Sequence, residues 1–330
     1  MRKIDRLSIS AHWKGVCFIA VVVLVATLLT IRDLSPRRIP EPLGPPEAVR
    51  LQGMQGDGAG VLEVPLVKYQ RLDGEGRGSG VTLDFIGAVH MGDEEYYRDL
   101  NRRFKEYDGV LFELVADPNR IRRVNKESAS SGLGWVQKQL SEVMGLSFQL
   151  EIIDYRAPNF IHADLSPEQL EAAMVARGET PWSLLKRILL VSADPKLRRR
   201  LKEFGGSSAE IEAINPVLTL LRGPTQRERL LLKRFMARSL LGSESFIDVL
   251  GGGKEFSLIH DRNQAVVEVV RREVKRGKRR LAIFYGTGHL SDLHSRLERD
   301  LGFKIVSVEW LPAWKIPAVE GRRSPNDGAP

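Results

Sequence analysis

The pattern of apolar and polar residues predicts a strand, a helix and a second strand within one short stretch of the chain. Residues 81–86 are mainly apolar over the length of a strand and run directly into Gly-Ala-Val-His, which ends at His90. In the helix expected next, apolar residues recur at helical spacing, and Asp93 can cap the N-terminus. A second buried strand is expected at residues 110–115, where Glu113 interrupts an otherwise apolar run.

The same order of elements recurs near the C-terminus. Residues 281–285 are an apolar run that leads into Gly-Thr-Gly-His, ending at His289. A leucine-rich helix is expected next, with Ser291 as its cap, and then a strand at residues 304–310 that contains Glu309. Two such units predict parallel strands joined by right-handed crossovers. Because ligands bind beyond the carboxyl ends of parallel strands, we expect both histidines to lie at one site.

Between the two units the pattern is mainly helical, which indicates a large insertion at about residues 120–255. Helices are expected within it at residues 133–144, 167–176, 182–191 and 226–241. A longer helix at about 255–276 leads into the second unit. The predicted fold class is therefore α/β. It comprises a mixed, mainly parallel sheet from the two units, the helical insertion, and one transmembrane helix before them.

The transmembrane helix is expected because 17 consecutive residues, 15–31, carry no charge. At about 1.5 Å per residue this run covers about 25 Å, near the lower limit for a bilayer span. A cleavable signal peptide is the alternative, but no small-x-small cleavage site follows the run. We expect residues 1–32 to anchor a single-pass membrane protein in the lipid bilayer. A slight excess of basic residues before the span places the main domain outside the cytoplasm.

Composition and charge limit the remaining possibilities. Prolines and glycines predict a linker at residues 33–60, followed by an α/β domain at 61–315 and a disordered tail at 316–330. The net charge is +8, but the basic residues are spread along the chain without a nucleic-acid-binding module, so we expect no nucleic-acid partner. The only cysteine, Cys17, lies in the apolar run. Any metal in the domain would therefore need His, Asp or Glu ligands.

The two Gly-x-x-His sequences suit a chemical site. Glycine permits a sharp turn, and a neutral imidazole beyond the turn can bind a divalent metal or transfer a proton. One such histidine is usually a turn residue, but two in equivalent places indicate a shared function. Glu113 is costly to bury unless it binds a metal or pairs with a buried arginine such as Arg262, and both can hold together. Asp164, in a polar loop after Tyr155, is either a helix cap or a partner in the site.

Four motifs in order resemble the TraB/PrgY/TIKI family over about residues 60–312. They run from Phe85 to His90, from Leu111 to Leu114, from Asp261 to Asn263 and from Tyr285 to His289. The family is similar in fold to haem-binding ChaN-like and erythromycin-esterase-like proteins, and some members are membrane-tethered, metal-dependent proteases. The resemblance implies a divalent metal ion, with manganese and cobalt as candidates, and a peptide or protein substrate.

We therefore expect a membrane-anchored, divalent-metal-dependent hydrolase, a peptidase in which a metal lowers the pKa of bound water. The expected metal ligands are His90, His289, Glu113 and Asp164. The expected catalytic residues are Glu113 as a general base, Arg262 for the developing negative charge, and Tyr155 and Asn263 as orienting groups. The alternatives are a non-catalytic anchored protein that binds a peptide or haem in the same cleft, and a structural membrane protein with a vestigial site.

Overall fold

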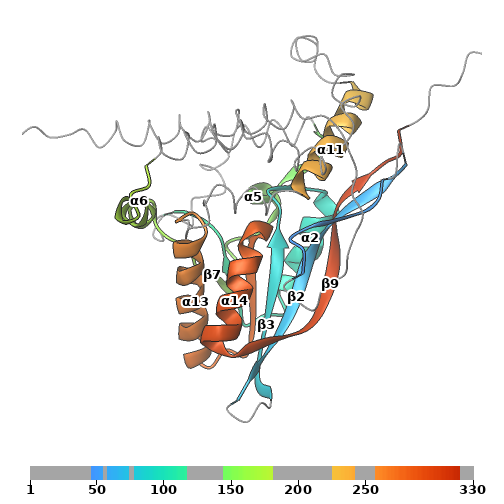
Figure 1. Cartoon of the computed structure of the whole chain (residues 1–330). Coiled ribbons are helices and arrows are strands. Elements are labelled where there is room, and N and C mark those ends of the chain that lie inside the picture. The colour runs from blue at the N-terminus through green and yellow to red at the C-terminus, as the bar shows by residue number, and fades with distance from the viewer. Residues whose placement is uncertain are drawn as a thin grey trace, which may run out of the picture.

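The computed structural model describes residues 46–54, 58–73, 78–116, 144–180, 225–241 and 257–319. A central sheet runs through the molecule with helices on both of its faces (Figure 1). Its strands are β1 (Arg50–Gly53), β2 (Gly60–Leu72), β3 (Gly78–Ala88), β5 (Gly109–Phe112), β7 (Phe160–His162), β8 (Arg280–Gly286) and β9 (Phe303–Ile316). Two short strands, β4 (Met91–Gly92) and β6 (Ser147–Phe148), form a separate pair.

The central sheet is mixed. Its order is β1-β2-β3-β8-β5-β7, and β9 pairs with β2. The pairs β3–β8, β8–β5 and β5–β7 are parallel, whereas β2 is antiparallel to β1, β3 and β9. The α/β class with a mixed sheet is confirmed. Three of the six pairings described in the central sheet are parallel.

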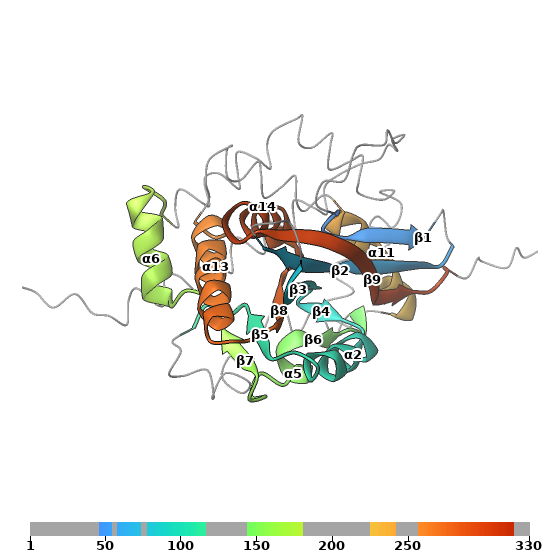
Figure 2. The ribbon, with the colours of Figure 1, turned by 90° about the horizontal axis from the view of Figure 1, so that it is seen from below.

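The helices of the described residues pack in two layers. They are α2 (Glu94–Phe104), α5 (Gln149–Ile152), α6 (Pro167–Ala176), α11 (Gln226–Leu240), α13 (His260–Lys275) and α14 (Leu290–Leu301). Figure 2 shows α13 and α14 on one side of the sheet and α2 and α5 on the other. Each side has its own apolar core, because the apolar stripes of α2 and α5 meet one face of the strands and those of α13 and α14 meet the other.

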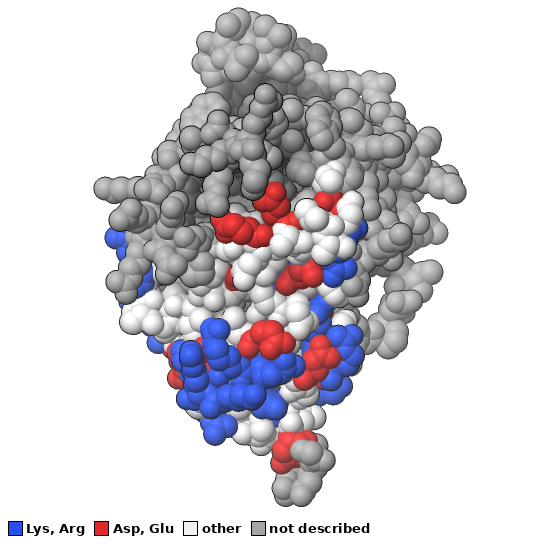
Figure 3. Space-filling model, turned by 90° about the vertical axis from the view of Figure 1, so that its left-hand side faces the viewer, with Lys and Arg blue, Asp and Glu red and all other residues white. Residues whose placement is uncertain are grey.

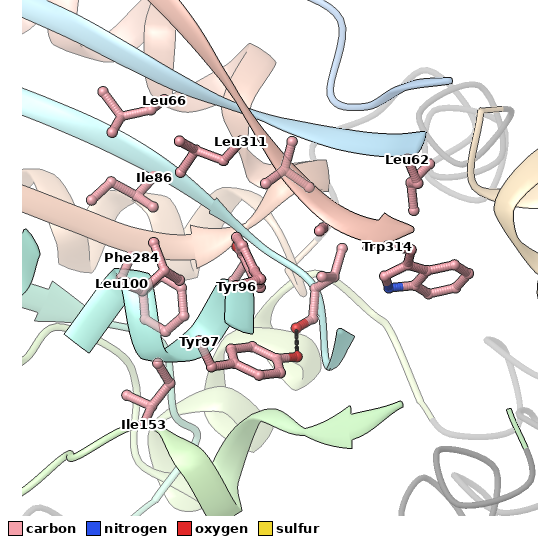
Figure 4. Close-up of a cluster of buried hydrophobic side chains, with 14 of the residues drawn as sticks. Leu62, Leu66, Ile86, Tyr96, Tyr97, Leu100, Ile153, Phe284, Leu311 and Trp314 are labelled. Atoms are coloured by element: carbon pink, nitrogen blue, oxygen red, sulfur yellow. Dashed lines mark hydrogen bonds between the residues drawn. The ribbon is translucent and has the colours of Figure 1, made fainter. Parts of the chain in front are cut away.

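Helix α2 fixes the end of β3, where the first histidine follows. Its buried residues are those predicted from helical spacing: Tyr96, Tyr97, Leu100 and Phe104. The hydroxyl groups of the two tyrosines donate hydrogen bonds of 2.7 Å to the carbonyl oxygens of Gly87 and Val89, and Figure 4 shows the second of these bonds. Both bonds are buried, so the backbone that leads to His90 is held by the core rather than by solvent.

The two predicted strand–helix–strand units are present, but their strands do not pair within a unit. In the first unit, β8 lies between β3 and β5. In the second unit, β3 and β2 lie between β8 and β9. The units therefore interlock, and β3 and β8, the two strands that carry the Gly-x-x-His sequences, become parallel neighbours.

Several boundaries differ from the prediction. Strand β1 lies inside the predicted linker 33–60, because it lengthens the sheet beside the N-terminal half of β2. The predicted insertion 120–255 is not purely helical, since it supplies β7 to the central sheet. Ser291 lies inside α14, which begins at Leu290 after a 3-10 turn. Asp93 precedes α2 as expected, but its side chain contacts Lys233 instead of capping the helix.

Other predicted elements agree with the structure or lie outside its described part. Helix α6 spans the predicted residues, and Ser166 caps it. Helix α13 begins at His260, later than about 255. The helices predicted at 182–191 and, apart from Met144, at 133–144 lie outside the described residues. The apolar run 15–31, predicted to be a membrane anchor, also lies outside the described residues. No helix of the described residues is long and apolar enough to cross a membrane.

Basic side chains, which are spread along the sequence, gather at one end of the folded molecule. Residues 271–280 contain seven of them, and this segment joins the end of α13 to the start of β8. Figure 3 shows a concentration of Lys and Arg side chains at this end of the molecule. Because β8 starts at this end, the carboxyl ends of the parallel strands lie at the other end of the sheet.

Candidate functional site

Four neighbouring parallel strands end beside one another, and a polar side chain follows each end. His90 follows β3, His289 follows β8, Glu113 follows β5 and Asp164 follows β7. Arg262, in the first turn of α13, reaches the same place. The two histidines follow the carboxyl ends of parallel strands as predicted, whereas Glu113 lies just after β5 and not inside a strand at 110–115. The sheet order β3-β8-β5-β7 brings the strand ends together from positions far apart in the sequence.

The two glycines that begin the motifs serve close packing, not a sharp turn. Gly87 lies within β3, where a Cβ atom would stand 2.8 Å from Cγ2 of Thr287 and 3.2 Å from Cδ of Pro65. Gly286 ends β8, where a Cβ atom would stand 3.1 Å from Oε2 of Glu113. The backbone N–H of Gly286 donates a 2.6 Å hydrogen bond to the same oxygen. The glycines therefore let the second motif and Glu113 approach the strands closely.

Arg262 binds both carboxylates of the site. Its Nη2 donates to Oε1 of Glu113 at 2.7 Å and to Oδ2 of Asp164 at 2.6 Å, and its Nε donates to Oδ1 of Asp164 at 2.9 Å. Its Nη1 makes only long contacts, 3.4 Å to the carbonyl oxygen of Leu258 and 3.5 Å to Nε2 of His289. The sequence left open whether Asp164 caps a helix or joins the site, and its contacts place it in the site.

These contacts set the charges of the site. Burial alone would raise the pKa of Glu113, but the guanidinium of Arg262, with His289 and His90, holds that pKa well below its usual range. Burial lowers the pKa of His289 to about 4, and Arg262 adds to this effect. At neutral pH the site therefore holds a neutral imidazole next to an ionised carboxylate and a guanidinium.

The two histidines differ in their surroundings. His289 is 4% exposed, and its Nδ1 lies 2.6 Å from Oδ1 of Asn263. Its Nε2 faces the ion cluster, 3.7 Å from Oε1 of Glu113. His90 is exposed, and its carbonyl oxygen accepts a hydrogen bond from the backbone of Gln149. Both histidines act on the charge of Glu113, and the side chain of His289 is held within the cluster by Asn263 and Glu113.

The predicted metal ligands have suitable chemistry, since imidazole and carboxylate groups bind divalent ions. Within the described part of the chain, however, no three His, Cys, Asp or Glu side chains stand together as a metal site. Between Glu113 and Asp164 stands the guanidinium of Arg262, which already occupies oxygens of both carboxylates. As they are arranged, these residues do not fit a divalent ion at that position, and the metal stays a prediction from the resemblance.

Tyr155 stands at the inner wall of the site. It is buried against Phe112 and Phe160, and its hydroxyl oxygen accepts a 2.6 Å hydrogen bond from Nε2 of Gln149. Burial raises the pKa of Tyr155, and the charge of Glu113 raises it further. The tyrosine is thus near Glu113, as expected of an orienting residue, but its hydroxyl group is hydrogen-bonded to Gln149. No sequence signal had singled out this glutamine.

A second residue that the sequence did not single out is Asp292, which binds Nδ2 of Asn263 at 2.7 Å. The acid was visible in the first turn of the helix after His289, where acids are common because they complement the helix dipole. Glu309, the equivalent of Glu113 in the second unit, binds Arg103 and lies outside the cluster. Its strand, β9, pairs with β2 at the far side of the sheet from β5.

The remaining histidines of the described part have structural partners. Nε2 of His162 contacts the carbonyl oxygen of Leu114 at 2.6 Å. His294 contacts the hydroxyl of Tyr69, and His260 contacts Arg296. The sequence offered no partners for these last two, because each contact joins elements that are distant in the sequence.

Comparison with protein-family models, with curated proteins and with solved structures finds no match to this chain. The resemblance to the TraB/PrgY/TIKI family therefore stays an expectation carried by four short motifs. The candidate site stands on its own geometry: Arg262 held by Glu113 and Asp164, with the neutral ring of His289 beside it.

Proposed function

We propose that this chain is a hydrolase in which His289 is the general base and Arg262 stabilises the oxyanion. The observation that carries the proposal is the position of the neutral His289 ring. Its Nε2 faces both Nη1 of Arg262 and Oε1 of Glu113, at the carboxyl ends of the parallel strands. The side chains of Arg262 and Glu113 keep 11% and 16% of their surface exposed, so the cluster is largely but not completely buried.

The contacts support a separate role for each of the side chains of His289, Arg262 and Glu113. In the proposed reaction, Nε2 of His289 takes a proton from a water molecule while the water oxygen bonds to the substrate carbonyl carbon. The negative charge moves to the carbonyl oxygen, and Nη1 of Arg262 donates to it, since this nitrogen has only long contacts in the cluster. The protonated ring then returns its proton to the leaving amine as the carbonyl–nitrogen bond breaks. Glu113 stabilises the transient imidazolium.

Glu113 is a weak candidate for the base. Its carboxylate accepts from Arg262 and from the backbone of Gly286, and its lowered pKa makes proton uptake unfavourable near neutral pH. The low pKa of His289 also limits its basicity, but its ring is neutral and carries one unprotonated nitrogen. Within this proposal, Glu113 and Asp164 position Arg262.

The proposed substrate class and the proposed membrane anchorage rest on the sequence. The family resemblance supports a peptide or protein substrate and a divalent metal ion, and the apolar run at residues 15–31 supports anchorage in a membrane with the domain outside the cytoplasm. The steps above involve only side chains of this chain. A dependence of cleavage on manganese or cobalt is therefore a separate prediction, which the same assay measures.

The test is cleavage of a peptide library by the full chain, with added Mn²⁺ or Co²⁺ and with a chelator. His289→Ala and Arg262→Gln are each expected to lower kcat by about 10²- to 10⁴-fold, the usual contribution of a general base or an oxyanion donor. His294→Gln is the matched control, because His294 contacts Tyr69 away from the cluster. Cleavage that survives His289→Ala would refute the proposal.

One observation favours the alternative of a non-catalytic binding protein. Nη1 of Arg262 makes only long contacts within the cluster, so it can donate a hydrogen bond to a carboxylate of a bound ligand without any reaction. This alternative predicts that the full chain binds library peptides or haem without cleaving them under any metal condition. It also predicts that His289→Ala changes the affinity alone.

A further inference from the structure

Asp292 decides which end of the Asn263 side chain faces His289. Oδ2 of Asp292 accepts hydrogen bonds from Nδ2 of Asn263 at 2.7 Å and from Nε of Arg296 at 2.6 Å. A carboxylate only accepts hydrogen bonds, so it selects the nitrogen end of the amide. The oxygen end is therefore turned toward the imidazole ring.

The orientation of the amide in turn determines the tautomer of the ring. Oδ1 of Asn263 lies 2.6 Å from Nδ1 of His289, and an amide oxygen only accepts, so Nδ1 must carry the proton. In the neutral ring the other nitrogen, Nε2, is then unprotonated. We propose that Asp292 is a positioning residue that, through Asn263, keeps the unprotonated nitrogen of His289 directed at Arg262 and Glu113.

Burial makes Asn263 depend on Asp292. Asn263 is 0% exposed, so bulk water cannot replace the carboxylate as the partner of its Nδ2. The other acceptor near Nδ2, the carbonyl oxygen of His289, is 3.4 Å away. Arg296 is 4% exposed and holds Asp292 through a short bond, so the carboxylate has a fixed direction. Without Asp292 the amide can turn over, and Nδ2 would then donate to Nδ1 and leave the proton of the ring on Nε2.

The tautomer can be measured without any substrate. In the full chain labelled with ¹⁵N at histidine, long-range ¹H–¹⁵N correlation at pH 7 distinguishes the two ring nitrogens, and His289→Ala identifies the signals of His289. We expect the Nδ1–H tautomer in the wild type. Asp292→Ala is expected to shift the tautomer ratio toward Nε2–H by about tenfold or more, the effect of one lost hydrogen bond.

Two matched variants distinguish an effect of the Asn263 amide orientation from a general loss of structure. Asp292→Asn keeps an accepting oxygen and should keep the Nδ1–H tautomer, and Asp300→Ala removes an exposed acid from the last turn of the same helix. An Nε2–H ring in the wild type, or an unchanged tautomer in Asp292→Ala, would overturn the inference. Should Asp292→Ala fail to fold, the wild-type tautomer decides alone.

The use of this tautomer rests on the proposed function, but the two fail separately. If the chain is a hydrolase, kcat should fall in Asp292→Ala in proportion to the measured loss in the fraction of the Nδ1–H tautomer, and should stay near the wild-type value in Asp292→Asn. A tautomer that responds as expected in a chain that cleaves nothing supports the role of Asp292 and refutes the hydrolase. Cleavage by a chain whose His289 tautomer is unchanged in Asp292→Ala supports the hydrolase and refutes the role of Asp292.

Discussion

The buried ion cluster predicts a large and pH-dependent loss of stability when its cation is removed. Arg262→Met places an apolar side chain of similar length in the first turn of α13. It leaves the carboxylates of Glu113 and Asp164 without the guanidinium that binds them. The side chain of Asp164 is 0% exposed and that of Glu113 is 16% exposed, so water compensates for little of the loss. Breaking such a buried pair typically costs about 3–5 kcal/mol. This is a large part of the total stability of a domain.

The pH dependence has a definite sign. In the wild type the pKa of Glu113 is held below its usual 4.5, so this group contributes stability above pH 4.5 that is lost as the pH falls through the lowered pKa. In the variant, burial acts without the guanidinium and raises the pKa of the same carboxyl. Protonation then relieves the variant as the pH falls. The difference in free energy of unfolding between the two proteins should therefore shrink on acidification.

Urea unfolding of the full chain, followed by circular dichroism at pH 7 and pH 5, measures this difference. Arg98→Met is the matched control, because Arg98 and Glu94 form an exposed pair on α2 that is worth at most about 0.5 kcal/mol. Adding Glu113→Gln and Asp164→Asn to Arg262→Met should recover part of the loss, since no unpaired charge then remains. A cost no larger than that of Arg98→Met would show that the cluster does not stabilise the fold.

Three further predictions concern the strand ends and the ring. Gly87→Ala should destabilise by about 1–3 kcal/mol because the new methyl group meets Cγ2 of Thr287, and adding Thr287→Ser should restore part of the loss in urea titrations. Tyr97→Phe leaves the buried carbonyl of Val89 without its donor and should cost about 1–2 kcal/mol in thermal unfolding; a neutral effect would contradict this. Burial lowers the pKa of His289 from 6.5 to about 4, so the folded protein should be more stable above pH 6.5 than below pH 4 by about 3 kcal/mol from this group. This stability is lost as the pH falls toward 4, and a His289→Ala variant that keeps the same pH slope would refute it.

Much of the local structure could be predicted because it depends on spacing along the chain. The apolar residues of α2 and α14 recur at helical intervals, and the buried faces are the predicted ones. The helix predicted at 167–176 agrees with α6, whose start is set by Ser166 and Pro167, because capping requires only neighbouring residues. The position of the histidines after strands was also predictable, and with it the end of the sheet at which a site is expected.

Contacts between distant parts of the chain could not be predicted in this way. The strand β7 has three residues, too few for a period to be recognised, and its place beside β5 is visible only in the folded sheet. The role of Gly87 was misjudged for a similar reason. Its neighbours Thr287 and Pro65 come from other strands and turns, so the sequence showed the glycine but not the packing that requires it.

For the site, the sequence by itself determined the inventory: two histidines after strands, an acid in an apolar run, and an arginine at the start of a long helix. Only the tertiary structure decided how these groups are paired. It placed Arg262 between Glu113 and Asp164. It buried His289 and left His90 exposed. It also brought Asp292 into hydrogen-bonding contact with Asn263. The reason is physical. Spacing along a chain fixes which way a side chain points from its own element, but partners and pKa values depend on the order in which strands assemble and on the burial that results.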